Sequence, residues 1–135
     1  ESDRRRILNY GHTIGHALEA LGGYRSLIHG EAVGIGLVLE ADLARHQGYC
    51  DSETVDRIRS LVLAAGLSDR PTSRSSGKVW TAMQHDKKVS QGKVVGVWPE
   101  SIGQVRIAPL ERTAFTDWFK TVPVGARGRS KRVEN

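Results

Sequence analysis

Three histidines, His12, His16 and His29, lie close together near the start of this 135-residue chain. On a helix, His12 and His16 would lie one turn apart on the same face, with Cβ atoms about 5 to 6 Å apart. His29 follows the turn signal Gly22-Gly23, which would allow the chain to fold back beside the first segment. Imidazole nitrogen suits Zn²⁺, and catalytic zinc commonly has three protein ligands and one open position. The spacing therefore indicates a candidate metal site.

The residues around the histidines bear on this interpretation. A His-x-x-x-His pair also occurs by chance, with neutral histidines hydrogen-bonded inside a core. Thr13 stands where a zinc peptidase would have glutamate after its first histidine, which argues against peptidase chemistry. Gly11 and Gly15 directly precede the first two histidines, so we expect this face to admit a bulky group.

The elements that must position these histidines follow from the hydrophobic pattern, which predicts a mainly α-helical bundle with one small β-hairpin. Helices are expected over residues 5–21, 31–46, 52–65, 78–85 and 110–122. The second is apolar on nearly every side and should lie in the core, where Gly34 and Gly36 let another backbone approach. Ser52 is the expected cap of the third. The hairpin strands are expected at 93–98 and 104–108.

Composition places the chain among globular domains, with 39% hydrophobic and 26% charged residues. No apolar run approaches the roughly 20 residues of a membrane helix, so we expect no membrane association. Cys50 is the single cysteine, which suits a reducing compartment such as the cytoplasm. Because the chain opens with Glu-Ser-Asp-Arg, we interpret it as a piece of a longer protein.

The net charge of +5 is concentrated at the C-terminus, where the last eleven residues carry +3. The basic residues there are Arg127, Arg129, Lys131 and Arg132. We therefore predict one helical domain over residues 1–124 and a basic, disordered tail over 125–135. The body of the chain carries little excess charge, so nucleic acid is not the expected partner.

Three segments together carry a family resemblance: "RRILNYGHTIGHALEA", "HGEAVGIGLVLEADLA" and "DKKVSQGKVVGVWPESIG". In order, spacing and flanking glycines they resemble the C-terminal domain of 3-dehydroquinate synthase, in the sugar phosphate cyclase superfamily. The resemblance implies a lyase of the shikimate pathway to aromatic amino acids. It would convert 3-deoxy-D-arabino-heptulosonate 7-phosphate to 3-dehydroquinate and phosphate in a cytoplasmic homodimer.

The resemblance also implies cofactors and a partner domain. Zinc would be bound by His12 and His29 together with an acidic ligand from a missing N-terminal half, and NAD mainly by that nucleotide-binding half. His16 matches a catalytic histidine used near the phosphate and in proton transfer. Arg5 and Asn9 match substrate-binding positions and are expected on the helix face of His12. The isolated chain is expected to be inactive and to bind zinc weakly.

Lys87 and Lys88 stand just before the expected hairpin, where the family has a lysine that reaches the substrate. The pattern does not separate the two, and both remain substrate-binding candidates. Two further functions also stay open. One is another cyclase, of the 2-epi-5-epi-valiolone or 2-deoxy-scyllo-inosose synthase type, and the other is a non-enzymatic metal-binding or interaction module.

Overall fold

The structure is a computed structural model that describes residues 10–22, 28–71, 74–86, 89–90 and 93–125. This part of the chain forms five helices and one three-stranded antiparallel sheet, in the strand order β1-β2-β3. The elements are α2 (His12–Leu21), α3 (His29–His46), α4 (Ser52–Ala64), α5 (Ser76–Asp86), β1 (Val89–Ser90), β2 (Lys93–Ser101), β3 (Gln104–Leu110) and α6 (Arg112–Phe119). The predicted fold class, mainly helical with a small hairpin, is confirmed.

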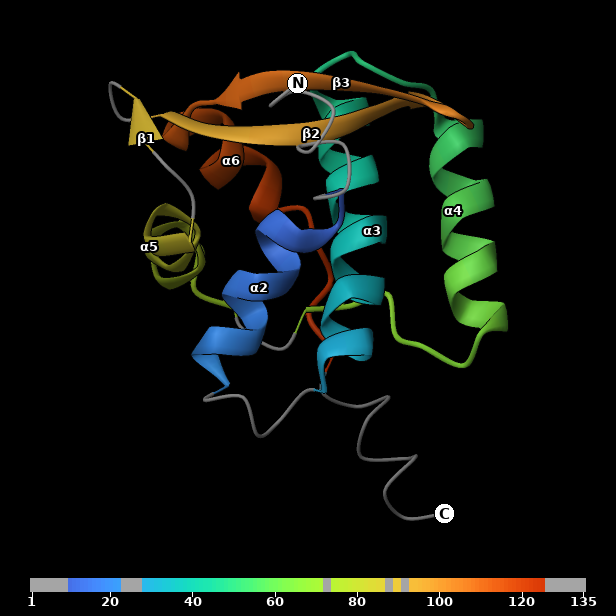
Figure 1. The fold of residues 1–135 in the computed structure, drawn as a ribbon, viewed down its shortest axis with the longest axis horizontal. Coiled ribbons are helices and arrows are strands. Elements are labelled where there is room, and N and C mark those ends of the chain that lie inside the picture. Colours follow the sequence, from blue (N-terminus) through green and yellow to red (C-terminus); the bar gives the residue numbers. More distant parts are fainter. Residues whose placement is uncertain (1–9, 23–27, 72–73, 87–88, 91–92, 126–135) are drawn as a thin grey trace.

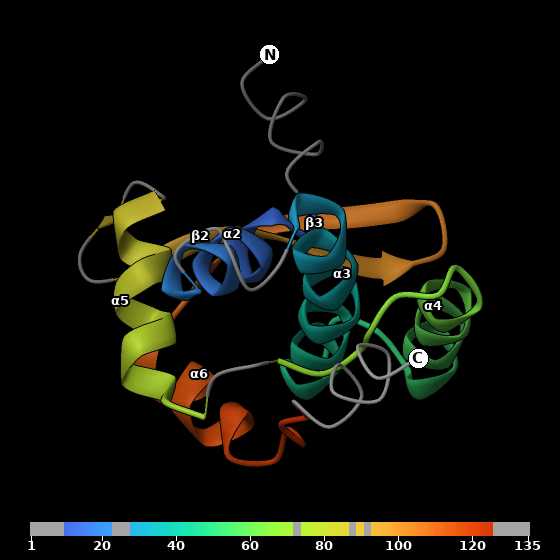
Figure 2. The same cartoon turned by 90° about the horizontal axis from the view of Figure 1, so that it is seen from below.

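Helix α3 is the central element (Figure 1). It packs between α2 and α4 and also contacts β2 and α6, while α5 lies against the other side of α2 (Figures 1 and 2). Burial of apolar residues around most of its circumference explains this position, as expected for a helix without a polar face. No helix among the described residues is both long enough and apolar enough to cross a lipid bilayer.

Glycines allow α2 and α3 to approach each other closely. A Cβ atom on Gly15 would lie 2.8 Å from the carbonyl oxygen of Ala32, and one on Gly36 would collide with the carbonyl of Gly11. The prediction that another backbone comes close is therefore confirmed for Gly36 but wrong for Gly34, whose neighbour is the side chain of Leu67. The expectation for Gly11 and Gly15 needs correction, because the group that comes close to both is α3 itself.

The helix that carries His12 and His16 begins inside the range over which the hydrophobic pattern predicted one continuous helix. Gly11 has φ +86°, in the left-handed region, and α2 begins at His12. A continuous helix over residues 5–21 is therefore wrong at Gly11, because a left-handed residue interrupts the helical hydrogen-bond ladder. The shared helix face inferred for Arg5, Asn9 and His12 no longer follows from periodicity.

The third helix was placed correctly, but its cap was not. Asp51, rather than Ser52, caps α4, since its carboxylate accepts the backbone N–H of Thr54 at 2.9 Å. Gly66 lies just past the end of α4 and has φ +82°, as expected for a glycine at that position.

The hairpin is longer than predicted. Strands β2 and β3 pair from Val94 opposite Leu110 to the turn at Ile102 and Gly103, with Pro99 included opposite Val105. The register shifts between Pro99 and Ser101, where a residue without a backbone N–H is tolerated. The two-residue strand β1 adds a third partner that was too short to predict.

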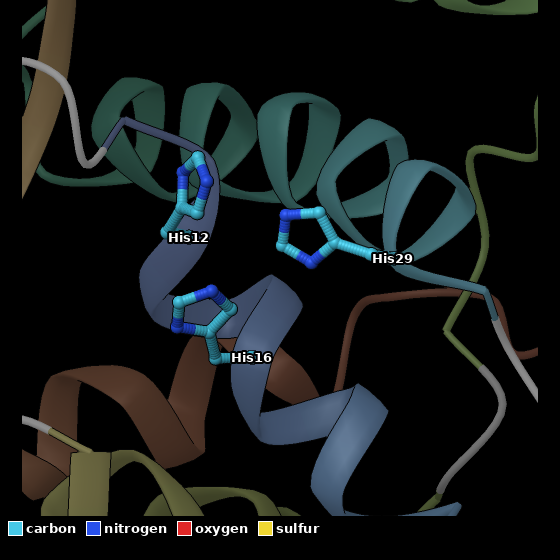
Figure 3. A group of neighbouring side chains, drawn as sticks. All are labelled: His12, His16 and His29. Atoms are coloured by element: carbon cyan, nitrogen blue, oxygen red, sulfur yellow. The ribbon is translucent and has the colours of Figure 1, made fainter. Parts of the chain in front are cut away.

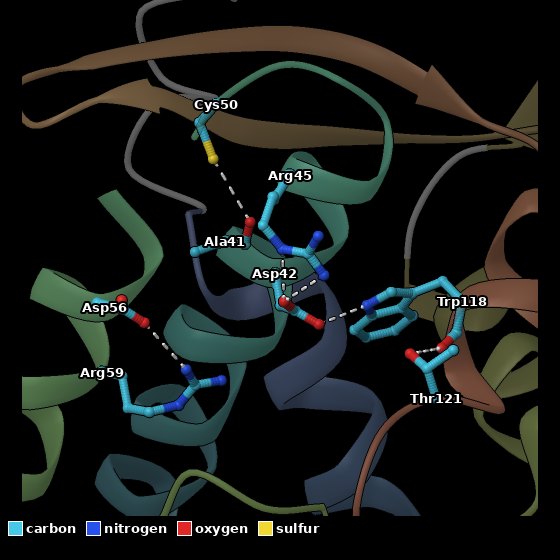
Figure 4. A network of polar contacts seen from close by, with 8 residues as sticks. All are labelled: Ala41, Asp42, Arg45, Cys50, Asp56, Arg59, Trp118 and Thr121. Atoms are coloured by element: carbon cyan, nitrogen blue, oxygen red, sulfur yellow. Dashed lines mark hydrogen bonds and ion pairs between the residues drawn. The ribbon is translucent and has the colours of Figure 1, made fainter. Parts of the chain in front are cut away.

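A polar contact fastens α6 to α3 (Figure 4). The indole Nε1 of Trp118 donates to Asp42 at 2.8 Å, and Arg45 holds the other carboxylate oxygen at 3.0 Å. Trp118 is otherwise buried with Phe115 and Phe119, so this aromatic cluster belongs to the core. The contact satisfies the one polar atom that burial of the indole would leave unpaired.

Candidate metal site

The starts of two neighbouring helices position the three histidines. His12 is the first residue of α2, His16 follows one turn later, and His29 is the first residue of α3. Because α2 and α3 pack side by side, their N-terminal turns bring these side chains into one region (Figure 3).

The three rings face one another across a short distance (Figure 3). Ring centroids are 4.9 Å apart for His12 and His16, and 5.6 Å apart for each pair that includes His29. One ring nitrogen from each histidine lies within 4.8 Å of the other two. His12 and His16 are partly buried and His29 is exposed, so the cluster opens to the surface. The predicted convergence of His12 and His29 is confirmed, and His16 joins them.

Hydrogen bonds at Nδ1 fix the tautomer of the His12 and His29 rings. His12 Nδ1 lies 3.3 Å from the carbonyl oxygen of Tyr10, and His29 Nδ1 lies 3.2 Å from Glu19 Oε1. A carbonyl and a carboxylate oxygen only accept, so in each neutral ring Nδ1 carries the hydrogen. The lone pair is then on Nε2, the atom left for a ligand.

This donor set fits a divalent metal of the zinc type. Tetrahedral zinc with nitrogen ligands places donor atoms about 3.3 Å apart, given Zn–N distances of about 2.0 to 2.1 Å. The observed spread of 4.8 Å exceeds this by an amount that side-chain rotation can close. Neutral imidazoles suit Zn²⁺ and Co²⁺ better than the oxygen-preferring Mg²⁺ and Ca²⁺.

Glu40 ties the start of α2 to α3. Its side chain is fully buried, and it accepts hydrogen bonds from the backbone N–H groups of Gly11 at 2.9 Å and Ile14 at 2.8 Å. Gly11 has no side chain with which to cap the helix, so a carboxylate from α3 pairs with donors that would otherwise be orphaned. A negative charge there is also favoured by the helix dipole. Glu40 thereby holds His12 in place relative to α3.

Tyr10 adds a second tie between the same segments. Its hydroxyl donates to the carbonyl oxygen of Leu37 at 2.7 Å. Burial, reinforced by the nearby charge of Glu40, raises the pKa of Tyr10 far above its ordinary value. The phenol therefore stays neutral at physiological pH and acts as a structural donor rather than as an acid or base.

Sequence reasoning missed both glutamates of this region. Glu40 interrupts an otherwise apolar stretch of α3, which is the signal that marks a buried carboxylate with partners. Glu19 stands one turn after His16 on α2, so it extends the face of His12 and His16. Helical spacing places Glu19 on that face, but its contact with His29 depends on how α2 packs against α3.

Four predicted substrate-binding residues lie outside the described residues: Arg5, Asn9, Lys87 and Lys88. Their roles stay predictions, as do the boundaries 1–124 and 125–135, because residues 126–135 also lie outside the described part.

A separate hollow of about 600 Å³ lies between the hairpin tip and α4, lined by Tyr10, Ile58 and residues 99–105. Its charged residue, Glu100, is paired with Arg106 at 2.7 Å. It contains none of the clustered histidines, so the histidine cluster is the candidate site for chemistry.

Curated proteins that are similar in sequence to this chain include several 3-dehydroquinate synthases. The chain is 44% identical over 108 residues to 3-dehydroquinate synthase of Desulforamulus reducens and 45% identical over 108 residues to that of Thermodesulfovibrio yellowstonii. Each alignment covers 79% of this chain and 30% of the relative. The chain thus spans about a third of the length of these enzymes.

Solved structures show the same fold at lower identity. A 2-deoxy-scyllo-inosose synthase complexed with carbaglucose-6-phosphate, NAD⁺ and Co²⁺ superposes with a TM-score of 0.71 at 22% identity, over 85% of this chain and 33% of that one. A 2-epi-5-epi-valiolone synthase from Streptomyces hygroscopicus, with NAD⁺ and Zn²⁺ bound, gives 0.71 at 21% identity, over 84% of this chain and 31% of that one.

A family model described as 3-dehydroquinate synthase C-terminal matches residues 1–89, which include all three clustered histidines. This match covers more than half of the chain and agrees with the curated relatives. The chain therefore belongs to the family of 3-dehydroquinate synthase C-terminal domains.

Proposed function

We propose that this chain is the metal-binding part of a 3-dehydroquinate synthase, which forms 3-dehydroquinate and phosphate from 3-deoxy-D-arabino-heptulosonate 7-phosphate. The observation that carries the proposal is the meeting of His12, His16 and His29 at one point. The proposed reaction is that of the enzyme for which the family is named. Since the chain spans about 30% of its relatives, the complete activity requires the remainder of the protein, including the part that binds NAD.

In this proposal His12 and His29 hold a divalent metal, zinc in the first instance, through Nε2. An acidic ligand from the N-terminal part completes the site. A bound zinc ion would act as a Lewis acid that polarises oxygen atoms of the substrate. The Nδ1 hydrogen bonds to Tyr10 and Glu19 keep both imidazoles in the tautomer that binding needs.

His16 is assigned to proton transfer beside the metal. Imidazole can accept and donate a proton near neutral pH, and the ring of His16 lies 4.9 Å from that of His12. Arg5 and Asn9 are proposed to bind the substrate carboxylate, because the guanidinium fork matches a carboxylate and asparagine adds neutral donors. Lys87 or Lys88 is proposed to bind phosphate or carboxylate.

A sister cyclase is the second candidate, since the similar solved structures include 2-deoxy-scyllo-inosose and 2-epi-5-epi-valiolone synthases. Those likenesses, at 22% and 21% identity, support the fold alone. Identity to 3-dehydroquinate synthases is about twice as high, at 44%. Arg5 and Asn9 also favour the substrate that has a carboxylate.

The test is phosphate release by the protein that carries this chain together with the N-terminal part present in its relatives. We expect turnover of 3-deoxy-D-arabino-heptulosonate 7-phosphate, and loss of most activity in His12→Ala, His29→Ala and His16→Ala. His46→Ala, an exposed histidine at the far end of α3, is the matched control and should keep activity. Turnover of only a carboxylate-free sugar phosphate would select the sister cyclases. Metal binding without turnover of any sugar phosphate would select a non-enzymatic module.

A further inference from the structure

A carboxylate from α2 reaches across to one of the clustered histidines on α3. Glu19 Oε1 lies 3.2 Å from Nδ1 of His29, the first residue of α3. The two side chains differ in exposure: that of His29 is 56% exposed and that of Glu19 only 13%. Most of the Glu19 side chain is therefore out of water, and the imidazole that it touches faces the cluster.

This pair differs from an ordinary surface ion pair. Exposed pairs contribute little to stability, because water screens the charges and two flexible side chains must be ordered. Here the acid is largely buried on a helix and the histidine is one of three rings that converge. Burial of a carboxylate has a cost that a hydrogen bond must offset. Within the described residues, the hydrogen bond of Glu19 is to His29.

We propose that Glu19 is the positioning residue for His29 in the metal site. By accepting the Nδ1 hydrogen, the carboxylate fixes the tautomer with its lone pair on Nε2 and holds the ring toward His12 and His16. The inference rests on the proposed metal-binding function, since it concerns how one ligand of that site is oriented.

The Nδ1 atoms of His12 and His29 have different kinds of hydrogen-bond partner. His12 has a main-chain partner, the carbonyl oxygen of Tyr10, which no side-chain substitution removes. His29 has a side-chain partner, which can be deleted. Glu19 is therefore the point at which the orientation of a single ligand can be tested without altering any imidazole.

The first measurement needs no metal. Nitrogen-15 NMR at about pH 8, where most imidazoles are neutral, reports which ring nitrogen carries hydrogen. We expect His29 in the 135-residue chain to carry it on Nδ1. In Glu19→Ala, His29 should become a mixture of tautomers while His12 stays unchanged. An unchanged His29 tautomer in Glu19→Ala would overturn the inference.

The second measurement is titration of the same proteins with Co²⁺, followed by visible absorption. Outer partners of ligating histidines typically change metal affinity by about 10- to 100-fold. We expect a loss of that size in Glu19→Ala and a smaller loss in Glu19→Gln, whose amide oxygen still accepts but is uncharged. Glu53→Gln, an exposed glutamate on α4, is the matched control and should bind as the unaltered chain does.

The outcomes distinguish the proposed metal site from the proposed positioning role of Glu19. Absence in the unaltered chain of even the weak Co²⁺ binding expected without the acidic ligand would reject the metal site itself and the positioning role with it. Binding by the unaltered chain and by Glu19→Ala with equal affinity would reject the positioning role alone. Thermal unfolding of the metal-free variants distinguishes orientation from folding, because loss of affinity at an unchanged unfolding midpoint is the result that supports positioning.

Discussion

The carboxylate of Glu40 accepts a hydrogen bond from the backbone N–H of Gly11, with 2.9 Å between oxygen and nitrogen. This contact joins the middle of α3 to the residue that precedes α2. It explains how a helix with glycine at its N-cap can begin at a fixed place and present His12 there.

Removing this contact should destabilise the protein. Glu40→Ala leaves the N–H groups of Gly11 and Ile14 unpaired and opens a cavity, with an expected loss of about 2 to 5 kcal/mol in the free energy of unfolding. Glu40→Gln can accept from only one of the two, with an expected loss of about 1 to 3 kcal/mol. Urea unfolding measures both. Equal stability of Glu40→Gln and the exposed control Glu53→Gln would contradict the capping role.

The close packing of α2 on α3 can be tested at Gly15. A Cβ atom there would lie 2.8 Å from the carbonyl oxygen of Ala32, so Gly15→Ala must push the helices apart. The expected loss is about 1 to 3 kcal/mol, together with weaker Co²⁺ binding.

Gly30→Ala is the control for Gly15→Ala, because no atom lies within 4 Å of a Cβ built at Gly30. It should be neutral or stabilising by up to about 1 kcal/mol, since alanine favours a helix more than glycine does. A Gly15→Ala protein as stable as Gly30→Ala would show that the helices are not in close contact.

The cap of α4 predicts a pH dependence. Hydrogen bonds from the Thr54 hydroxyl and backbone N–H lower the pKa of Asp51 below its ordinary value. A group whose pKa is lower in the folded state stabilises the fold above its unfolded pKa, about 3.9, and loses that contribution as pH falls through the folded value. An asparagine in place of Asp51 would also cap the helix but would not titrate.

The comparison is therefore between the unaltered chain and Asp51→Asn, unfolded with urea from about pH 7 down to about pH 3. The stability of the unaltered chain relative to Asp51→Asn should be constant near neutrality and fall in the acid range. A difference that stays constant throughout would mean that the Asp51 carboxylate is not held by Thr54.

Local patterns predicted much of this structure. The apolar circumference of α3 predicted a core helix, and the two short segments 93–98 and 104–108 predicted the hairpin. The break at Gly11 was missed because a helical pattern on both sides hides one left-handed residue. Strand β1 depends on pairing with β2 rather than on its own two residues.

The candidate site was also predicted only in part. Residue type and spacing identified the three histidines, because two lie on one helix face and the third follows a turn. The contacts of Glu19 and Glu40 join residues on different helices, so they follow from the packing of α2 on α3. Periodicity within one helix cannot specify such a pair.

The most direct test of the account is Co²⁺ titration of the 135-residue chain and of three single variants. The unaltered chain should bind one ion, His12→Ala and His29→Ala should each bind at least about tenfold more weakly, and His46→Ala should bind as the unaltered chain does. Binding of undiminished affinity in both His12→Ala and His29→Ala would contradict the claim that these two rings converge on a metal.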